Sequence, residues 1–389
     1  MRSVFARYGL LGPLVGLLLF CGISIGFAQT ERSSQQEKEL ELLDGEPYFA
    51  KANDIAEAYY STSTNHAQEF IEAYFLDGRI EEFPLQHARF LTLKGKMLTL
   101  QGHYQKAHGV LDQSISILKN QQAPYFLAQA YVGMGGLLIR RGDYDEARTN
   151  LEHGVALFQT GEVNETLANI HLLFGRLENI MGNLDSALDH YGKSIQMHEE
   201  MGNKKGISDV YYRIAVLYLD KNNEEKALQY FQDGRTIKEQ INDERGLANF
   251  NLSLGVLHEE KGLFETALDY YSQSLEGYRQ IGDKANLAKT YNNIGVAYVD
   301  WQKYDSAQVY HERSVTLHNE LKSPRGIIRA LSNLGEVHYL KSEYSKALKA
   351  YWAAKKVSEA TDREIMMGWI TNNIGQVHLA TEQLDSASH

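Results

Sequence analysis

YNNIGVAYVDWQKYDSAQVY, residues 291–310, contains a three-point frame that recurs along the chain. The frame consists of Gly295 in one apolar stretch, Gln302 at a turn and Ala307 in the next stretch. The alanine recurs every 40 positions without an insertion, at Ala67, Ala107, Ala147, Ala187, Ala227, Ala267, Ala307, Ala347 and Ala387. A fixed period of this length indicates tandem structural repeats.

Each repeat reads as two helices joined by a turn. Apolar residues lie three and four positions apart, as in Ala267-x3-Tyr271, which is the spacing of one helical face. A mid-helix glycine such as Gly295 costs about 1 kcal/mol relative to alanine, so its recurrence predicts that a neighbouring backbone fills the space beside it. Glycine or asparagine marks the turn phase and permits a left-handed helix end, at Gly102, Gly142, Gly182, Asn222 and Gly262.

The helix starts are marked by capping residues. Asn203, Asp243, Asp283 and Ser323 lie one period apart, and each side chain can accept a hydrogen bond from a free N–H group of a first helical turn. The later turns lack the glycine, at Gln302, Ser342 and Glu382. We still expect a turn at each of them, with a final helix that stops one turn after it begins.

The repeats resemble the tetratricopeptide repeat family, whose signature is W-x2-L-G-x2-Y followed by A-x3-F. Residues 211–218 and 227–231 match that pattern well. The period of 40 is similar to the long-repeat variant, as in the input regions of bacterial sensor and regulatory proteins with such repeats. The resemblance implies an all-α fold, a right-handed α-solenoid of tandem antiparallel helix pairs.

The chain divides into four expected parts. Residues 1–28 read as a signal peptide, because two arginines precede an apolar run that ends in Gly-Phe-Ala; an uncleaved membrane anchor is the alternative. Residues 29–47 read as a polar linker or a frayed helical cap, and residues 48–83 as a degenerate N-terminal repeat or cap. Residues 84–389 form the array, whose last repeat we expect to be truncated in a chain that naturally continues.

The sequence predicts no catalytic residues, no metal site and no cofactor. The net charge of −11 argues against nucleic-acid binding, which requires clustered basic residues. Residues 133–136 are glycine-rich but follow no strand, so they are not a dinucleotide-binding loop. His258, His338 and His378 share one repeat phase, which places them in a row and not around one metal ion. Cys21, the sole cysteine, lies in the signal segment.

The resemblance implies that the first helix of each repeat lines a concave groove that binds a peptide or a partner helix. Carried over by phase, the candidate partner-binding residues are Asn292, Asn293, Asn333, Asn372 and Asn373. A carboxamide can both donate to and accept from a main chain. The alternative is that these asparagines bond the next helix.

Charge on the same phases is acidic in the middle repeats. Glu259, Glu260 and Asp300 are the main candidates, with Asp209 and Asp220 nearby and Lys289 as the one opposing charge. An acidic surface favours a basic partner through steering and selection. A merely solvated acidic face is the alternative.

We therefore expect an exported, non-enzymatic protein–protein interaction scaffold in the periplasm, which forms the input part of a larger signalling protein. A free periplasmic adaptor for envelope assembly is one alternative, and an enzyme whose catalytic domain lies beyond His389 is another. We expect membrane contact only through the N-terminal signal segment or a missing C-terminal helix.

Overall fold

The computed structural model describes residues 39–40, 42–62, 67–71, 78–159, 162–360 and 367–387, and every regular element in those ranges is a helix. The expected signal peptide and most of the expected linker lie outside them. The chain divides into two compact units, Met1–Asn183 and Leu184–His389, and we describe each by itself.

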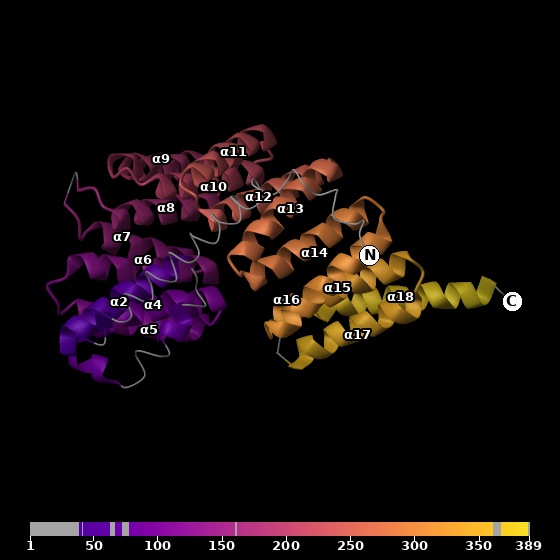
Figure 1. The fold of residues 1–389 in the computed structure, drawn as a ribbon, viewed down its shortest axis with the longest axis horizontal. Helices are drawn as coiled ribbons and strands as arrows, with labels where there is room; N and C mark the ends of the chain where they lie inside the picture. The colour runs from indigo at the N-terminus through magenta and orange to yellow at the C-terminus, as the bar shows by residue number, and fades with distance from the viewer. Residues whose placement is uncertain are drawn as a thin grey trace, which may run out of the picture. The chain divides into compact units, whose positions relative to one another are not determined.

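Unit 1 is a stack of helix pairs preceded by one helix and a short 3-10 turn (Figure 1). Its described elements are α2 (Gly45–Thr62), η1 (Arg79–Glu82), α4 (Pro84–Gln101), α5 (Tyr104–Leu118), α6 (Pro124–Arg141), α7 (Tyr144–Val155) and α8 (Glu165–Ile180). α4 pairs with α5 and α6 pairs with α7, while α6 also contacts α4 and α8.

Helix α2 belongs to the core of unit 1. It begins at Gly45, before the boundary expected at residue 48, so it includes the end of the expected linker. Phe49 and Ile55 of α2 are buried in one cluster with Phe90 of α4. Asn53 Nδ2 donates to the Gln86 carbonyl oxygen at 2.9 Å, which fixes α2 on the first turn of α4. Residues after position 48 thus cover the open side of the first helix pair.

Unit 2 repeats one helix pair with little variation (Figure 1). Its described elements are α9 (Leu184–Glu200), α10 (Lys204–Asp220), α11 (Glu224–Gln240), α12 (Glu244–Glu260), α13 (Phe264–Gln280), α14 (Lys284–Asp300), α15 (Tyr304–Glu320), α16 (Pro324–Leu340), α17 (Tyr344–Ala360) and α18 (Met367–Ala387). We call the first helix of each pair an A helix (α10, α12, α14, α16, α18) and the second a B helix (α9, α11, α13, α15, α17).

The mid-helix glycines of the A helices receive side chains from the B helices. A Cβ atom added to Gly255 would lie 2.5 Å from the Tyr271 ring, and one added to Gly335 would lie 2.8 Å from the Tyr351 ring. The prediction that a neighbouring backbone fills this space is therefore wrong. The glycine makes room for a large ring of the partner helix, which packs the pair closely without a backbone crossing.

The capping prediction is confirmed at three of its four positions. Asn203, Asp243 and Asp283 each accept a hydrogen bond from the backbone N–H group three residues later, at 2.8 to 3.0 Å. Ser323 makes no such bond. There Pro324 starts α16 with its φ angle already set for a helix, so the helix begins without a side-chain cap.

Two of the three turns without glycine keep the left-handed conformation. Gln302 has a φ of 60° and Ser342 a φ of 58°. The turn expected at Glu382 is absent, because α18 continues as one helix to Ala387. Gln302 and Ser342 are held by a B helix that follows and packs back on its A helix. Glu382 has neither a glycine nor, within the described residues, such a packed partner, so local helix propensity extends α18.

Candidate functional site

The A helices of unit 2 form one layer, in which α12 contacts α14 and α14 contacts α16. Four side chains of α14 that remain at least partly exposed lie three and four positions apart and share one side of the helix: Lys289, Asn293, Val296 and Asp300. We call this side of α14, together with the equivalent sides of α10, α12, α16 and α18, the A-face. It is the surface on which most of the predicted binding residues fall.

A hydrogen bond between side chains links neighbouring A helices across this layer. Asn333 Nδ2 donates to Asn292 Oδ1 at 3.0 Å, joining α16 to α14. The hydroxyl groups of Tyr212 and Ser253 are 3.0 Å apart and join α10 to α12 at the same register. For Asn292, which is buried, the structure therefore shows the alternative role, a bond to the next helix.

Asn293 and Asn373 lie at the register of Asn333 but make no such bond. By the same offset of 41 residues that joins Asn333 to Asn292, Leu252 lies opposite Asn293 and Ser332 lies opposite Asn373. Leucine offers no polar atom, and the buried Ser332 hydroxyl has no partner among the described residues. Within the described part of the chain neither carboxamide has a hydrogen-bond partner, although both side chains are partly exposed. Asn372 is exposed beside Asn373 on α18.

The predicted acids gather at the C-terminal ends of the A helices. The Tyr271 hydroxyl donates to Glu259, and burial, joined by the nearby Asp300 and Glu260 charges, raises the pKa of Glu259 to about 7. Burial also raises the pKa of Asp300. Asp209 is different, because its carboxylate is 2.6 Å from the ammonium group of buried Lys238 and is therefore compensated.

Two arginines that the sequence pattern had not predicted lie with Lys289 at the other end of the A-face. Lys289, Arg325 and Arg329 are exposed on α14 and α16. Burial and then the nearby Arg329 charge lower the pKa of Lys289, and burial and then Arg325 lower the pKa of Arg329, so the three cations lie close together. Arg329 is one period after Lys289, which was the available signal. The net negative charge of the whole chain gave no indication of this local basic group.

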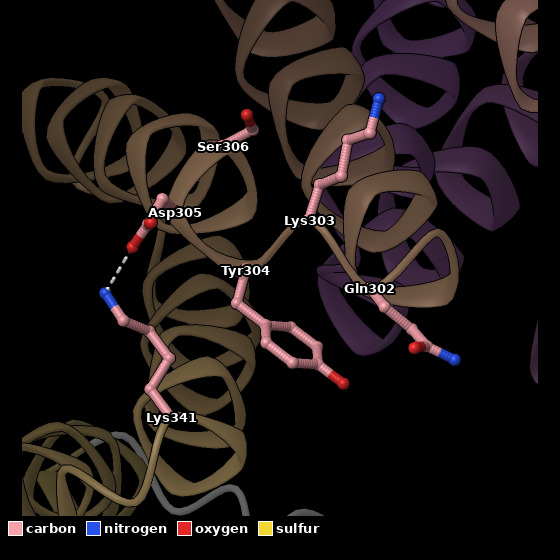
Figure 2. A pocket seen from close by; sticks show the side chains of 6 residues that line it. All are labelled: Gln302, Lys303, Tyr304, Asp305, Ser306 and Lys341. Carbon is pink, nitrogen blue, oxygen red and sulfur yellow. Dashed lines mark ion pairs between the residues drawn. The ribbon is translucent and has the colours of Figure 1, made fainter.

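A shallow hollow lies beside the turn between α14 and α15 (Figure 2). It is lined by Gln302, Lys303, Tyr304, Asp305, Ser306 and Lys341. Figure 2 shows Lys341 reaching across to Asp305, and the Nζ and Oδ1 atoms are 2.7 Å apart. This ion pair joins one repeat to the next. Neither a histidine nor a cysteine lines the hollow to act with the tyrosine as an acid–base pair, so its geometry indicates a structural junction.

Two of the histidines that share one repeat phase, His258 and His338, contact residues in or just before the B helices. The His258 ring stacks on Tyr270 with centroids 5.3 Å apart, as Tyr298 stacks on Tyr310 at 5.5 Å. His338 Nδ1 lies 2.7 Å from a Glu343 oxygen. Among the described residues no three His, Cys, Asp or Glu side chains come together in a way that would hold a metal ion. A search of the same residues finds no helix long and apolar enough to cross a membrane.

The paired helices, their 40-residue register and the polar A-face define an array of tandem helix-pair repeats. The sequence matches the model of the tetratricopeptide repeat family at residues 126–200, 166–240 and 246–320. Over this stretch the chain belongs to that family, and the resemblance of its motifs is confirmed. Proteins built of such repeats are typically non-catalytic interaction scaffolds, and this chain has that architecture.

Solved structures with the same fold share little sequence with the chain. A signal-transduction ATPase with a tetratricopeptide repeat sensor, from Pyrococcus horikoshii, is 14% identical with a TM-score of 0.55 over 87% of this chain. A Rap protein complexed with Competence and Sporulation Factor is 10% identical, with a TM-score of 0.53 over 86% of this chain and 98% of its own length. The Cut9–Hcn1 hetero-tetramer structure is 16% identical, with a TM-score of 0.52 over 88% of this chain.

The match covers 55% of the ATPase and 58% of the Cut9–Hcn1 chain, so this chain spans little more than half the length of either. A search of curated proteins found no match. At these identities the structural likeness shows the fold.

Proposed function

We propose that the A-face binds an extended segment of a partner protein, and that Asn293 and Asn373 hold the main chain of that segment. The observation that carries the proposal is the pair of partly exposed carboxamides that have no hydrogen-bond partner in the described chain. An extended segment has unpaired N–H and C=O groups, and one carboxamide can serve both. Asn333, bonded to Asn292, lies between them in register and keeps an oxygen that can accept.

The structural relatives are compatible with this role. The Rap structure holds a bound factor, and the Cut9–Hcn1 structure is an assembly of two kinds of protein. Repeat arrays bury a shared core and use their exposed layer for partners. The function that fits this chain best is therefore a non-enzymatic interaction scaffold.

The test is a displayed library of random peptides of roughly ten residues, the length that spans about three repeats at ~3.3 Å per residue. Peptides enriched on the full chain are measured against Asn293→Ala combined with Asn373→Ala. The loss of two hydrogen bonds, at roughly 1 kcal/mol each, should weaken binding about thirtyfold. Asn319→Ala on the exposed side of α15 is the matched control and should leave affinity unchanged. Equal affinity for both variants would count against the A-face.

We further propose that the array is exported and acts as the input part of a larger signalling protein, with a free periplasmic adaptor as the alternative. The support is the basic and apolar pattern of residues 1–28 together with the family of the array. Fusion of alkaline phosphatase to residue 30 tests export, because that enzyme folds only where its disulfides form. An inactive fusion would contradict this part alone. The reading frame beyond codon 389 then distinguishes the two alternatives.

A further inference from the structure

The charges at both ends of α10 and α14, and at one end of α12 and of α16, are the reverse of what helix stability favours. The first turns of α10, α14 and α16 contain no acidic residue and carry cations: Lys204, Lys205, Lys284 and Arg325. The last turns of α10, α12 and α14 carry acids: Asp220, Glu259, Glu260 and Asp300. The helix dipole favours the opposite placement, by roughly 0.3–1 kcal/mol for each charge.

Two B helices of the same unit, α11 and α13, follow the dipole. α11 begins with Glu224 and Glu225 and has Lys238 in its last turn, and α13 begins with Glu265 and has Arg279 in its last turn. The reversal on α10 and α14 is thus not shared by α11 and α13, the B helices that lie next to them in the chain. Where a chain breaks a local stability rule on some helices and keeps it on their neighbours, the exception points to function.

Arg325, Glu259, Glu260 and Asp300, together with Lys289, Arg329 and Glu336 from within the helices, form two charged edges on the A-face. The basic edge consists of Lys289, Arg325 and Arg329, and none of the three has an ion pair or hydrogen bond in the described part of the chain. Their mutual repulsion is therefore not relieved within that part. An unpaired cluster of this kind is available to carboxylate groups of a partner.

The acidic edge consists of Glu259, Glu260, Asp300 and Glu336, on three successive A helices. Asp300 raises the pKa of both Glu259 and Glu336, after burial in each case, so the acids are close enough to repel one another. Of these acids only Glu259 has a hydrogen bond or ion pair within the described residues, the bond from Tyr271. The acidic edge is thus available to cations.

The two edges are separated by the carboxamide row. Lys289 and Asp300 lie eleven residues apart on α14, or ~16 Å at ~1.5 Å per residue, and Asn293 lies between them. Side chains of an extended segment point alternately to opposite sides. A segment whose backbone follows Asn293 and Asn333 therefore directs successive side chains to opposite edges.

We propose that the A-face selects an extended partner segment in which acidic and basic side chains alternate, the acidic ones meeting the basic edge and the basic ones the acidic edge. This inference rests on the proposed function and specifies the partner's chemistry. A uniformly basic segment, which the acidic residues alone would favour, is attracted by one edge and repelled by the other. Opposed edges of this kind give selectivity more than affinity.

The experiment pans the same random peptide library on the full chain and on the variant Arg325→Glu with Arg329→Glu. On the wild-type chain, enriched peptides should alternate in charge. On the variant the former basic edge carries two glutamates beside Lys289 and is net acidic, so enriched peptides should become basic at both sets of alternate positions. This is a gain of a new preference, which a misfolded protein would not produce. The control is Lys349→Glu with Lys356→Glu on exposed positions of α17, which makes the same charge change in the B layer and should keep the wild-type preference.

The possible failures are distinguishable. If enriched peptides show no charge alternation but still lose affinity with Asn293→Ala and Asn373→Ala, the A-face binds segments and the charge inference is wrong. If both charge variants shift the preference equally, net charge and not the two edges selects the peptide, and the inference is again wrong. If the enriched peptides respond to no A-face substitution, both proposals fail.

Discussion

At the scale of single residues, His311 of α15 is buried at 0% exposure with both ring nitrogens unpaired in the described structure. Its ring packs on Gly295 as the Tyr271 ring packs on Gly255. At the same register, one and two periods away, the chain has Phe231, Tyr271 and Tyr351. The imidazole is thus a polar group in a position that the repeat builds for an aromatic ring.

We predict that His311→Phe stabilises the chain. Removing two unpaired buried nitrogens should raise the free energy of unfolding at pH 7 by about 1–3 kcal/mol. Burial lowers the pKa of His311 to about 4 from its ordinary 6.5, so the native state resists protonation. Stability from this group is present above pH 6.5 and is lost as the pH falls toward 4; the phenylalanine variant should lack that loss. Urea unfolding at pH 7 and at pH 5 measures the gain in unfolding free energy and its dependence on pH. The control is His103→Phe, at an exposed position.

The contribution of Glu259 to stability changes with pH in the direction opposite to that of His311. Its pKa is about 7 in the folded chain against an ordinary 4.5, so the native state holds the proton more tightly than the unfolded state. The stability that this proton contributes is full below pH 4.5 and is lost as the pH rises through 7.

Glu259→Gln should therefore raise the free energy of unfolding at pH 8 by about 1–3 kcal/mol, since each tenfold change in the proton affinity of a group corresponds to ~1.4 kcal/mol. At pH 5 the gain should be much smaller. Glutamine can still accept the bond from Tyr271. Glu225→Gln, at an exposed position, is the matched exchange and should change stability by less than about 0.5 kcal/mol at either pH. A pH-independent gain at residue 259 would contradict the raised pKa.

At the scale of the element, glycines at one repeat phase have different surroundings. Gly255 faces the Tyr271 ring, whereas Gly375 of α18 has no described atom within 4 Å of an added Cβ. The sequence pattern is the same at both positions, because the 40-residue register is local. The difference arises from the B helix that packs on α12 and that the described part of α18 lacks.

Alanine substitutions at these two positions should have opposite effects. Gly255→Ala should lower the free energy of unfolding by about 1–3 kcal/mol, because the methyl group collides with a buried ring. Gly375→Ala should raise the local helix stability by up to ~1 kcal/mol, since only the helix propensity changes. Thermal unfolding followed by circular dichroism measures both. Loss of stability at both positions would mean that Gly375 is also packed.

The element scale also shows what periodicity predicts well. The caps at Asn203, Asp243 and Asp283 and the left-handed turn at Gln302 depend on a few neighbouring residues, so they follow from the register alone. The predicted turn at Glu382 is wrong. A turn without glycine depends on a following B helix that packs on its A helix, and that contact is not local.

At the scale of the whole molecule, unit 2 is built by repetition, in which each helix pair contacts only its neighbours. Removing one whole period should therefore keep the fold. Deletion of residues 204–243 joins Asn203 to Glu244, so one capping residue replaces another and the A and B alternation is preserved.

We predict that this deletion leaves a helical, cooperatively folded chain with lower total stability. Deletion of residues 224–243 alone removes helix α11 and places two A helices in succession, so it should expose the apolar side of α10 and cause aggregation. Circular dichroism and size-exclusion chromatography distinguish the two products. A half-period deletion that folds as well as the full-period one would contradict the repeat architecture.

The period, the helix pairs, their caps and the family follow from the amino-acid order, because each depends on residues close together in the chain. The pairing of Asn292 with Asn333 does not, since it depends on which residues of successive repeats face each other across a layer. The same is true of Asn293 and Asn373, whose carboxamides lack a bond in the described chain because Leu252 and Ser332 lie opposite them. The two charged edges likewise exist only once three helices lie side by side, because separation in space and not along the chain sets the interaction between charges.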